Sequence, residues 1–236
     1  RTFTVFAWHA LRHCFKIKPD FIIGTTSRLM TGVLTWLTSI TLRNGYFVDI
    51  RDIFSETISD LFLAKSHLIG RGLKSVFSFM EWHLLVNATG VNVVSEAFPD
   101  YFQEKGIDTS KWTFFPNGVD REFIDFGFNT AGKCSDFKTV LYAGNIGSGQ
   151  GMEIIVPEVA KKLGSKFKFQ IVGDGSTCKL LEERITALGV GNVELLPPVE
   201  RTQLIKHYRT ADILFLHLNN VSAFKRVLPS KIFEYI

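Results

Sequence analysis

The chain has 236 residues, of which 46% are hydrophobic and 21% are charged, and its formal net charge is +4. This composition excludes a disordered or fibrous protein and predicts one or two globular domains with a substantial core. The small positive charge is compatible with anionic substrates or an anionic membrane surface, but an ordinary, slightly basic surface explains it better, and we expect no nucleic-acid partner.

The three cysteines, Cys14, Cys134 and Cys178, lie far apart and form no CxxC pair. Their spacing argues against a zinc site and a disulfide framework, and it favours a reducing, cytoplasmic setting. The longest uncharged apolar stretch, 29–42, is shorter than the roughly 20 residues of a membrane-spanning helix, so we interpret it as a buried helix. Because the chain begins with Arg1 and ends within a helical pattern, we expect it to be an internal piece of a longer protein.

Short apolar runs that end in small or polar residues recur along the chain and predict buried strands. These runs are at 21–24, 46–50, 91–94, 113–115, 139–142, 167–172, 193–196 and 212–216. Segments whose apolar residues have helical spacing lie between several of these runs, for example at 152–163 and 180–188. Alternating strands and helices are typical of parallel sheets covered on both faces.

We therefore predict an α/β protein with two Rossmann-like domains. The first is expected at 1–120 and the second at 138–236, joined by a linker at 121–137 that is rich in turn residues and poor in aliphatic ones.

Loops that follow strands of the second half are candidates for a site, because parallel sheets bind ligands at the carboxyl ends of their strands. The glycine-rich loop 144–151 follows one such strand and opens a helix. Its backbone N–H groups and the helix start could hold a phosphate, although glycine is also common in such turns for steric reasons alone.

The next two loops carry a Gly-Asp-Gly-Ser turn at 173–176 and the pair Pro197 and Pro198. In the turn, capping of the following helix by Asp174 or Ser176 is the alternative to ligand contact. The prolines predict a rigid wall without backbone N–H donors.

A last helix is predicted to start at Pro229 and Ser230. Lys231 could pair with phosphate oxygens, and Glu234, one turn later on the same face, could accept hydrogen bonds from ribose hydroxyls. An ordinary surface helix with a Lys–Glu pair is the alternative.

Taken in order, the Gly-Asn, Val-Gly-Asp-Gly, Leu-Pro-Pro, Leu-Pro-Ser-Lys and Phe-Glu-Tyr motifs resemble the donor domain of family-four retaining glycosyltransferases of the GT-B fold. The likeness is greatest to bacterial enzymes that build O-antigen and capsule sugars, including N-acetyl-L-fucosamine transferases. In the first half the resemblance is carried by 18–25, 48–56, 93–96 and 115–120. It implies a GT-B fold in which both domains are truncated.

The resemblance also implies a set of donor-binding residues. They are Gly144, Asn145, Gln150, Gly173, Asp174, Pro197, Arg226, Ser230, Lys231 and Glu234. Asn145 and Gln150 stand where many relatives have the Arg and Lys that bind the donor pyrophosphate, so Arg226 and Lys231 are expected to supply the positive charge. Glu234 matches the second glutamate of the family's paired motif, and Arg226 stands at the first.

Three residues are implied as catalytic: Lys231 on the donor side, and Asp52 and Glu56 on the acceptor side. Asp52 and Glu56 follow a strand that faces the expected cleft, where relatives keep an acidic or histidine residue. A helix N-cap with charged first-turn residues explains the pair equally well. No Asp-x-Asp pattern lies near a strand end, so neither a metal nor another cofactor is expected.

The function implied is an EC 2.4 transfer of a sugar, with retention of configuration, from a UDP-linked donor to a lipid-linked or saccharide acceptor in bacterial cell-surface polysaccharide synthesis. The protein is expected in the cytoplasm, with any membrane contact peripheral, at the inner face, and through the aromatic and basic segment 62–82. A UDP-sugar 2-epimerase and a non-catalytic nucleotide-sugar-binding subunit remain as alternatives, and the piece alone is expected to be inactive.

Overall fold

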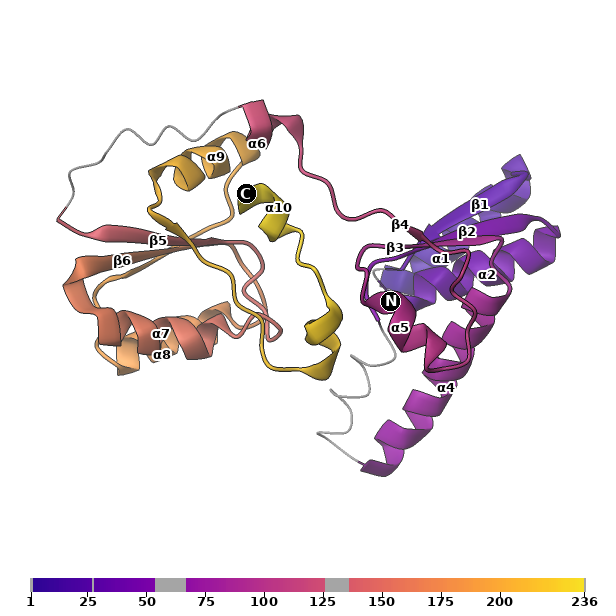
Figure 1. Cartoon of the computed structure of the whole chain (residues 1–236), viewed down its shortest axis with the longest axis horizontal. Helices are drawn as coiled ribbons and strands as arrows, with labels where there is room; N and C mark the ends of the chain where they lie inside the picture. The colour runs from indigo at the N-terminus through magenta and orange to yellow at the C-terminus, as the bar shows by residue number, and fades with distance from the viewer. Residues whose placement is uncertain (1, 27, 54–66, 126–135, 236) are drawn as a thin grey trace. The chain divides into compact units, whose positions relative to one another are not determined.

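The computed structural model describes residues 2–26, 28–53, 67–125 and 136–235 (Figure 1). The chain divides into two compact units. The first comprises 1–117 together with 221–228, and the second comprises 118–220 together with 229–236. Each unit contains one parallel four-stranded sheet.

The first unit is built on a sheet with strand order β1-β2-β3-β4. Its elements are α1 (Thr2–Ile17), β1 (Phe21–Thr25), α2 (Leu29–Leu42), β2 (Gly45–Ile50), α4 (His67–Val86), β3 (Gly90–Val93), α5 (Phe98–Gln103), β4 (Thr113–Phe114) and the 3-10 turn η2 (Ser222–Arg226). The core joins strand residues such as Val48 and Val91 to Leu84 of α4 and Phe98 of α5, all at most 2% exposed. Val227 packs against this core, which is why the late segment 221–228 belongs to the first unit.

The second unit is built on a sheet with strand order β7-β6-β5-β8. Its elements are α6 (Arg121–Asp125), β5 (Lys138–Ala143), α7 (Met152–Leu163), the 3-10 turn η1 (Gly164–Lys166), β6 (Phe167–Val172), α8 (Cys178–Ala187), β7 (Val193–Leu196), α9 (Arg201–Thr210), β8 (Ile213–Leu214) and α10 (Lys231–Tyr235).

Both faces of the second sheet are covered by helices, and alternate side chains of β5 pack into the two cores that result. Val140 and Tyr142 pack on one face in the core that α7 and α8 share, whereas Leu141 and Ala143 pack on the other with residues of α9 and α10 (Figure 1). Successive side chains of a strand point to opposite faces, so a stretch buried on both sides is apolar at successive positions, as 140–143 of β5 is.

The elements expected from the sequence are confirmed. A strand is found at each of the predicted positions, the apolar stretch 29–42 is helix α2, and the two predicted amphipathic helices are α7 and α8. Among the helices of the described residues, none is both long and apolar enough to cross a membrane. One local expectation is wrong: α8 is preceded by Thr177 at its N-cap, not by Asp174 or Ser176, and no side chain caps it.

Candidate functional site

A cavity of about 390 Å³ lies at the carboxyl ends of β5, β6 and β7 in the second unit. Its lining residues are Ala143, Gly144, Asn145, Val172, Gly173, Asp174, Pro198, Val199, Leu204, Tyr208, Lys231 and Glu234. The ends of parallel strands and the loops that follow them supply most of this wall, which is where open α/β sheets bind ligands. The volume is within the range of small-molecule pockets.

Two glycines allow the loops of this pocket to pack closely. A Cβ on Gly173 would lie 1.9 Å from the carbonyl oxygen of Gly144, so the two loops touch through their backbones. A Cβ on Gly144 would lie 2.0 Å from the Nζ of Lys231. Both glycines have positive φ, 148° for Gly144 and 147° for Gly173, which a residue with a side chain rarely adopts.

Several backbone N–H groups of the glycine-rich loop already donate to other backbone carbonyls. The N–H of Gly144 donates to Val172 at 2.8 Å, that of Ile146 to Asp174 at 2.9 Å and that of Gln150 to Gly147 at 3.0 Å. These groups cannot hold a phosphate without breaking sheet or turn bonds. Among the residues that line the pocket, Lys231 has the cationic side chain.

Lys231 is half-buried beside Gly144, and its ammonium lies 5.7 Å from the centre of the Tyr142 ring. Burial lowers the pKa of Lys231, while the charge of Glu234 raises it. The N–H groups of Ile232 and Phe233 donate to Pro229 and Ser230 at 3.1 Å. This confirms the predicted helix start.

Glu234 is held by a tyrosine from another helix. The Tyr208 hydroxyl, on α9, donates to Glu234 Oε2 at 2.8 Å. Burial and the neighbouring carboxylate raise the pKa of Tyr208, so this hydroxyl stays protonated and continues to donate.

Asn145 lines the pocket, whereas Gln150 does not line it but contacts Asn145. The amide of Asn145 donates to Gln150 Oε1 at 3.1 Å, and the Tyr142 hydroxyl donates to the Asn145 carbonyl at 2.6 Å. The loop is also tied to the segment after β8, because His217 Nδ1 lies 2.7 Å from the Gln150 carbonyl.

Among the predicted donor-binding residues, three others do not line this pocket. Pro198 rather than Pro197 forms the wall, and Ser230 lies outside it. Arg226 belongs to the first unit. There its guanidinium lies over the Tyr101 ring at 5.3 Å and its carbonyl accepts the Ser95 hydroxyl at 2.6 Å.

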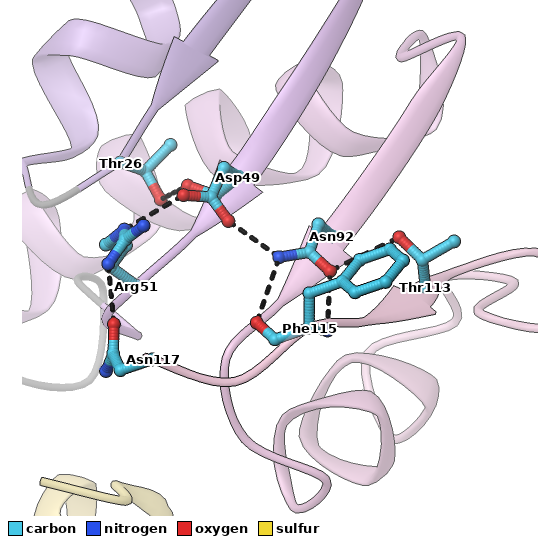
Figure 2. A network of polar contacts seen from close by, with 7 residues as sticks. All are labelled: Thr26, Asp49, Arg51, Asn92, Thr113, Phe115 and Asn117. Carbon is cyan, nitrogen blue, oxygen red and sulfur yellow. Dashed lines mark hydrogen bonds and ion pairs between the residues drawn. The ribbon is translucent and has the colours of Figure 1, made fainter. Parts of the chain in front are cut away.

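In the first unit, the carboxyl ends of three strands carry a polar network (Figure 2). Asp49 of β2 pairs in register with Asn92 of β3 and accepts a hydrogen bond from its amide at 2.7 Å. The other carboxylate oxygen of Asp49 pairs with Arg51 Nε at 2.9 Å, and Arg51 donates to Asn117 Oδ1 at 2.6 Å. The network fixes the backbone that leads directly to the predicted acceptor-side residue Asp52.

Asp52 has one side in solvent and the other against a small cavity lined by apolar residues such as Leu29, Leu84 and Leu85. Burial against this cavity raises the pKa of Asp52 to about 6, although Arg51 acts in the opposite direction. Glu56, the second predicted acceptor-side residue, lies outside the described residues.

The sequence did not single out Tyr208, Leu204 or Val199, which also line this pocket. Leu204 and Tyr208 are four positions apart on α9, a spacing that only marks one face of a helix. Nothing local indicates that this face meets α10.

Comparison with known proteins places the second half of the chain in a functional context. Residues 125–225 match the family model "Glycosyl transferases group 1". Lys231 and Glu234 lie just beyond the matched residues. Over 239 residues the chain is 26% identical to "Putative colanic acid biosynthesis glycosyl transferase WcaI" of Escherichia coli (strain K12), covering 98% of this chain and 58% of WcaI.

Solved structures share the fold. Anabaena Alr3699/HepE, crystallised in complex with UDP and glucose, aligns with a TM-score of 0.62 at 15% identity, covering 88% of this chain and 54% of HepE. A "putative UDP-N-acetylglucosamine 2-epimerase" from Listeria monocytogenes aligns with a TM-score of 0.51 at 11% identity, covering 89% of this chain and 54% of that protein. The chain thus spans little more than half the length of these proteins. Its two sheets have the GT-B fold, and residues 125–225 carry the sequence pattern of group 1 glycosyl transferases.

Proposed function

We propose that the protein containing this chain is a glycosyltransferase that moves a sugar from a nucleotide diphosphate donor to an acceptor in cell-surface polysaccharide synthesis. The observation that carries the proposal is the pocket in which Lys231 and Glu234 meet the Gly144 and Gly173 loops. The match to group 1 glycosyl transferases and the likeness to WcaI support the same activity.

The pocket offers two kinds of group to a nucleotide diphosphate. Lys231 supplies a positive charge for phosphate oxygens, and Glu234 supplies a carboxylate that can accept hydrogen bonds from ribose hydroxyls. We assign the diphosphate to Lys231 and the ribose to Glu234. A UDP-linked donor is proposed because HepE, of the same fold, was crystallised with UDP.

Catalysis in this proposal is mainly electrostatic. Negative charge builds on the departing diphosphate, and Lys231 stabilises it in a partly buried site where water screens the interaction less. We propose transfer with retention of configuration and assign no protein nucleophile. Asp52, at the carboxyl end of the first sheet, is proposed to contact the acceptor, which would be a lipid-linked or saccharide hydroxyl.

Two measurements on the complete protein test the donor site. Removing a hydrogen-bonding partner of a bound polar group costs about 1 to 3 kcal/mol, so Glu234→Ala should weaken UDP binding by roughly ten- to a hundredfold in calorimetry. Lys231→Ala should lower kcat more than it weakens UDP binding, because its charge acts most on the leaving diphosphate. Glu158→Ala, an exposed carboxylate on α7, is the matched control. Unchanged UDP affinity in a folded Glu234 variant would refute the assignment.

A product assay separates the alternatives. UDP-sugars are supplied with and without a lipid-linked acceptor, beginning with UDP-N-acetyl-L-fucosamine because of the resemblance described above. Release of UDP together with a glycosylated acceptor supports the transferase. A new epimer without release of UDP would identify an epimerase, which shares this fold. Binding of UDP without turnover would identify a subunit.

Peripheral membrane contact remains a proposal for the segment 62–82, of which residues 62–66 lie outside the described part of the chain. On α4, Phe77 packs against the core of the first unit, whereas Phe79 is 61% exposed and Trp82 is 40% exposed. Phe79→Ser should reduce flotation of the protein with anionic vesicles if this face meets a membrane. Flotation equal to that of the unchanged protein would remove the segment from consideration.

A further inference from the structure

We propose that Tyr208 is a positioning residue that sets how strongly this site discriminates nucleotides by their ribose hydroxyls. The inference rests on the proposed function, since it assumes that Glu234 meets the ribose. The observation behind it is the hydrogen bond of 2.8 Å that the Tyr208 hydroxyl donates to Glu234 Oε2. Both residues line the same pocket.

Glu234 needs such support because its side chain is flexible. A glutamate has three rotatable bonds, which it must immobilise to hold a ligand. A donor fixed in another element removes much of this freedom before the ligand arrives.

Tyr208 itself is held firmly. Tyr208 is only 5% exposed. The centre of its ring lies 5.4 Å from that of Tyr235, in an edge-on contact, and 5.7 Å from that of Phe123. Its hydroxyl therefore approaches Glu234 from a rigid position on α9.

The bond leaves Glu234 able to bind a ligand. A carboxylate has about four lone-pair sites, and Tyr208 takes one of them on Oε2. The remaining lone pairs can accept hydrogen bonds from a ligand. The two adjacent hydroxyls of a ribose can both donate to them. A ligand without these hydroxyls leaves the carboxylate unsatisfied in a partly buried pocket, which is the origin of the selectivity.

The test compares UDP with dideoxy-UDP, which lacks both ribose hydroxyls, by calorimetry on the complete protein. Tyr208→Phe keeps the ring and removes the hydroxyl. It should weaken UDP binding by about three- to tenfold and change dideoxy-UDP binding by less than about twofold. In Tyr208→Phe/Glu234→Ala, the tyrosine change should add no further loss, because the two residues act through one bond.

Tyr235→Phe is the matched control. It removes a half-buried hydroxyl from the neighbouring ring, but that hydroxyl donates to the Phe215 carbonyl at 3.3 Å and Tyr235 does not line the pocket. Its ratio of UDP to dideoxy-UDP affinity should equal that of the unchanged protein. Thermal melting of each variant checks that the second unit is folded.

The outcomes separate this inference from the proposed function. If Glu234→Ala abolishes the discrimination and Tyr208→Phe leaves it intact, or weakens both ligands equally, the positioning role is wrong and the donor site stands. If Glu234→Ala leaves the discrimination intact, Glu234 does not meet the ribose, and both the assignment and this inference are wrong.

Discussion

The backbone of Gly144 lies so close to Lys231 that a side chain at position 144 would displace the ammonium group of Lys231. A Cβ at position 144 would meet Lys231 Nζ at 2.0 Å, and the φ of 148° further disfavours any side chain. The far end of a lysine can move, so the fold can accommodate the overlap, but the ammonium would leave its place in the pocket.

We therefore expect Gly144→Ala to lower kcat by about tenfold or more while the protein remains folded. Gly189→Ala is the control, because Gly189 also has a positive φ of 65° but a Cβ there would meet nothing within 4 Å. The control should lose only stability, of the order of 1 kcal/mol. Equal kinetic effects of the two changes would show that strain, not displacement of Lys231, is responsible.

Asp52 provides a prediction about pH. Its folded pKa of about 6 lies above the value of 3.8 for an unperturbed aspartate, so between these values the folded protein binds the proton more tightly than the unfolded chain. The stability associated with the protonated form is complete below pH 4 and is lost as the pH rises through about 6. Water at the exposed side of Asp52 limits the size of the effect.

Asp52→Asn should remove this fall in stability between pH 4 and pH 7, measured by urea denaturation. Tryptophan fluorescence is a suitable probe because Trp8, Trp36, Trp82 and Trp112 all belong to the first unit. Asp108→Asn serves as control: the Ser110 N–H donates to Asp108 at 2.9 Å and lowers its pKa, so it is already ionised in this window. The same pH dependence in Asp52→Asn and in the unchanged protein would contradict the prediction.

At the scale of secondary-structure elements, the first sheet depends on a side chain that joins three strands. Asn92 of β3 is 6% exposed, and its amide donates to Asp49 of β2. Its carbonyl oxygen accepts the Phe115 N–H at 2.9 Å and the Thr113 hydroxyl at 3.3 Å. The strand β4 has only two residues, so these bonds are a large part of its attachment to the sheet.

Asn92→Ala should therefore destabilise the first unit by about 1 to 3 kcal/mol, because Asp49 and the Phe115 N–H each lose one of their hydrogen-bond partners. The measurement is again urea denaturation followed by tryptophan fluorescence. Asn87→Ala, which removes an exposed amide bonded to the His83 carbonyl at 2.7 Å, should change stability by less than about 0.5 kcal/mol. A similar small change at Asn92 would mean that the network does not hold β4 in place.

At the scale of the whole molecule, the chain passes between its two units three times, after Asn117, Asn220 and Leu228. The division at Asn117 lies a few residues before the boundary expected near residue 120. No local pattern indicates that 221–228 belongs to the first unit, because packing of Val227 and the Ser95 bond to Arg226 are contacts between residues distant in the chain.

We expect limited proteolysis to cut first between Asp120 and Lys138, since this stretch combines turn residues with few aliphatic ones. After that cut the two fragments should still co-elute in size-exclusion chromatography, because 221–228 is covalently part of the second fragment and packs in the first unit. They should separate in denaturant. A first cut within either sheet would argue against the linker, and native fragments that elute apart would argue against the role of 221–228.

The sequence alone determined the elements of this protein. The stretch 140–143 of β5 is apolar at every position because both faces of its sheet are buried, and helices such as α7 keep one apolar face, so local composition specifies them. Six predicted donor-binding residues also line one pocket: Gly144, Asn145, Gly173, Asp174, Lys231 and Glu234. They could be found because loops after neighbouring parallel strands always share one edge of a sheet.

Only the tertiary structure decided which groups around those residues complete the site. Tyr208 reaches Glu234 from 26 positions away in the chain, and Arg226 packs in the first unit although Lys231, five positions later, lines a pocket in the second. Such contacts depend on how elements that are distant in the sequence pack against each other in the folded chain. No local period or spacing encodes them, because propensity and patterning act over one or two turns, whereas packing selects partners by shape over the whole fold.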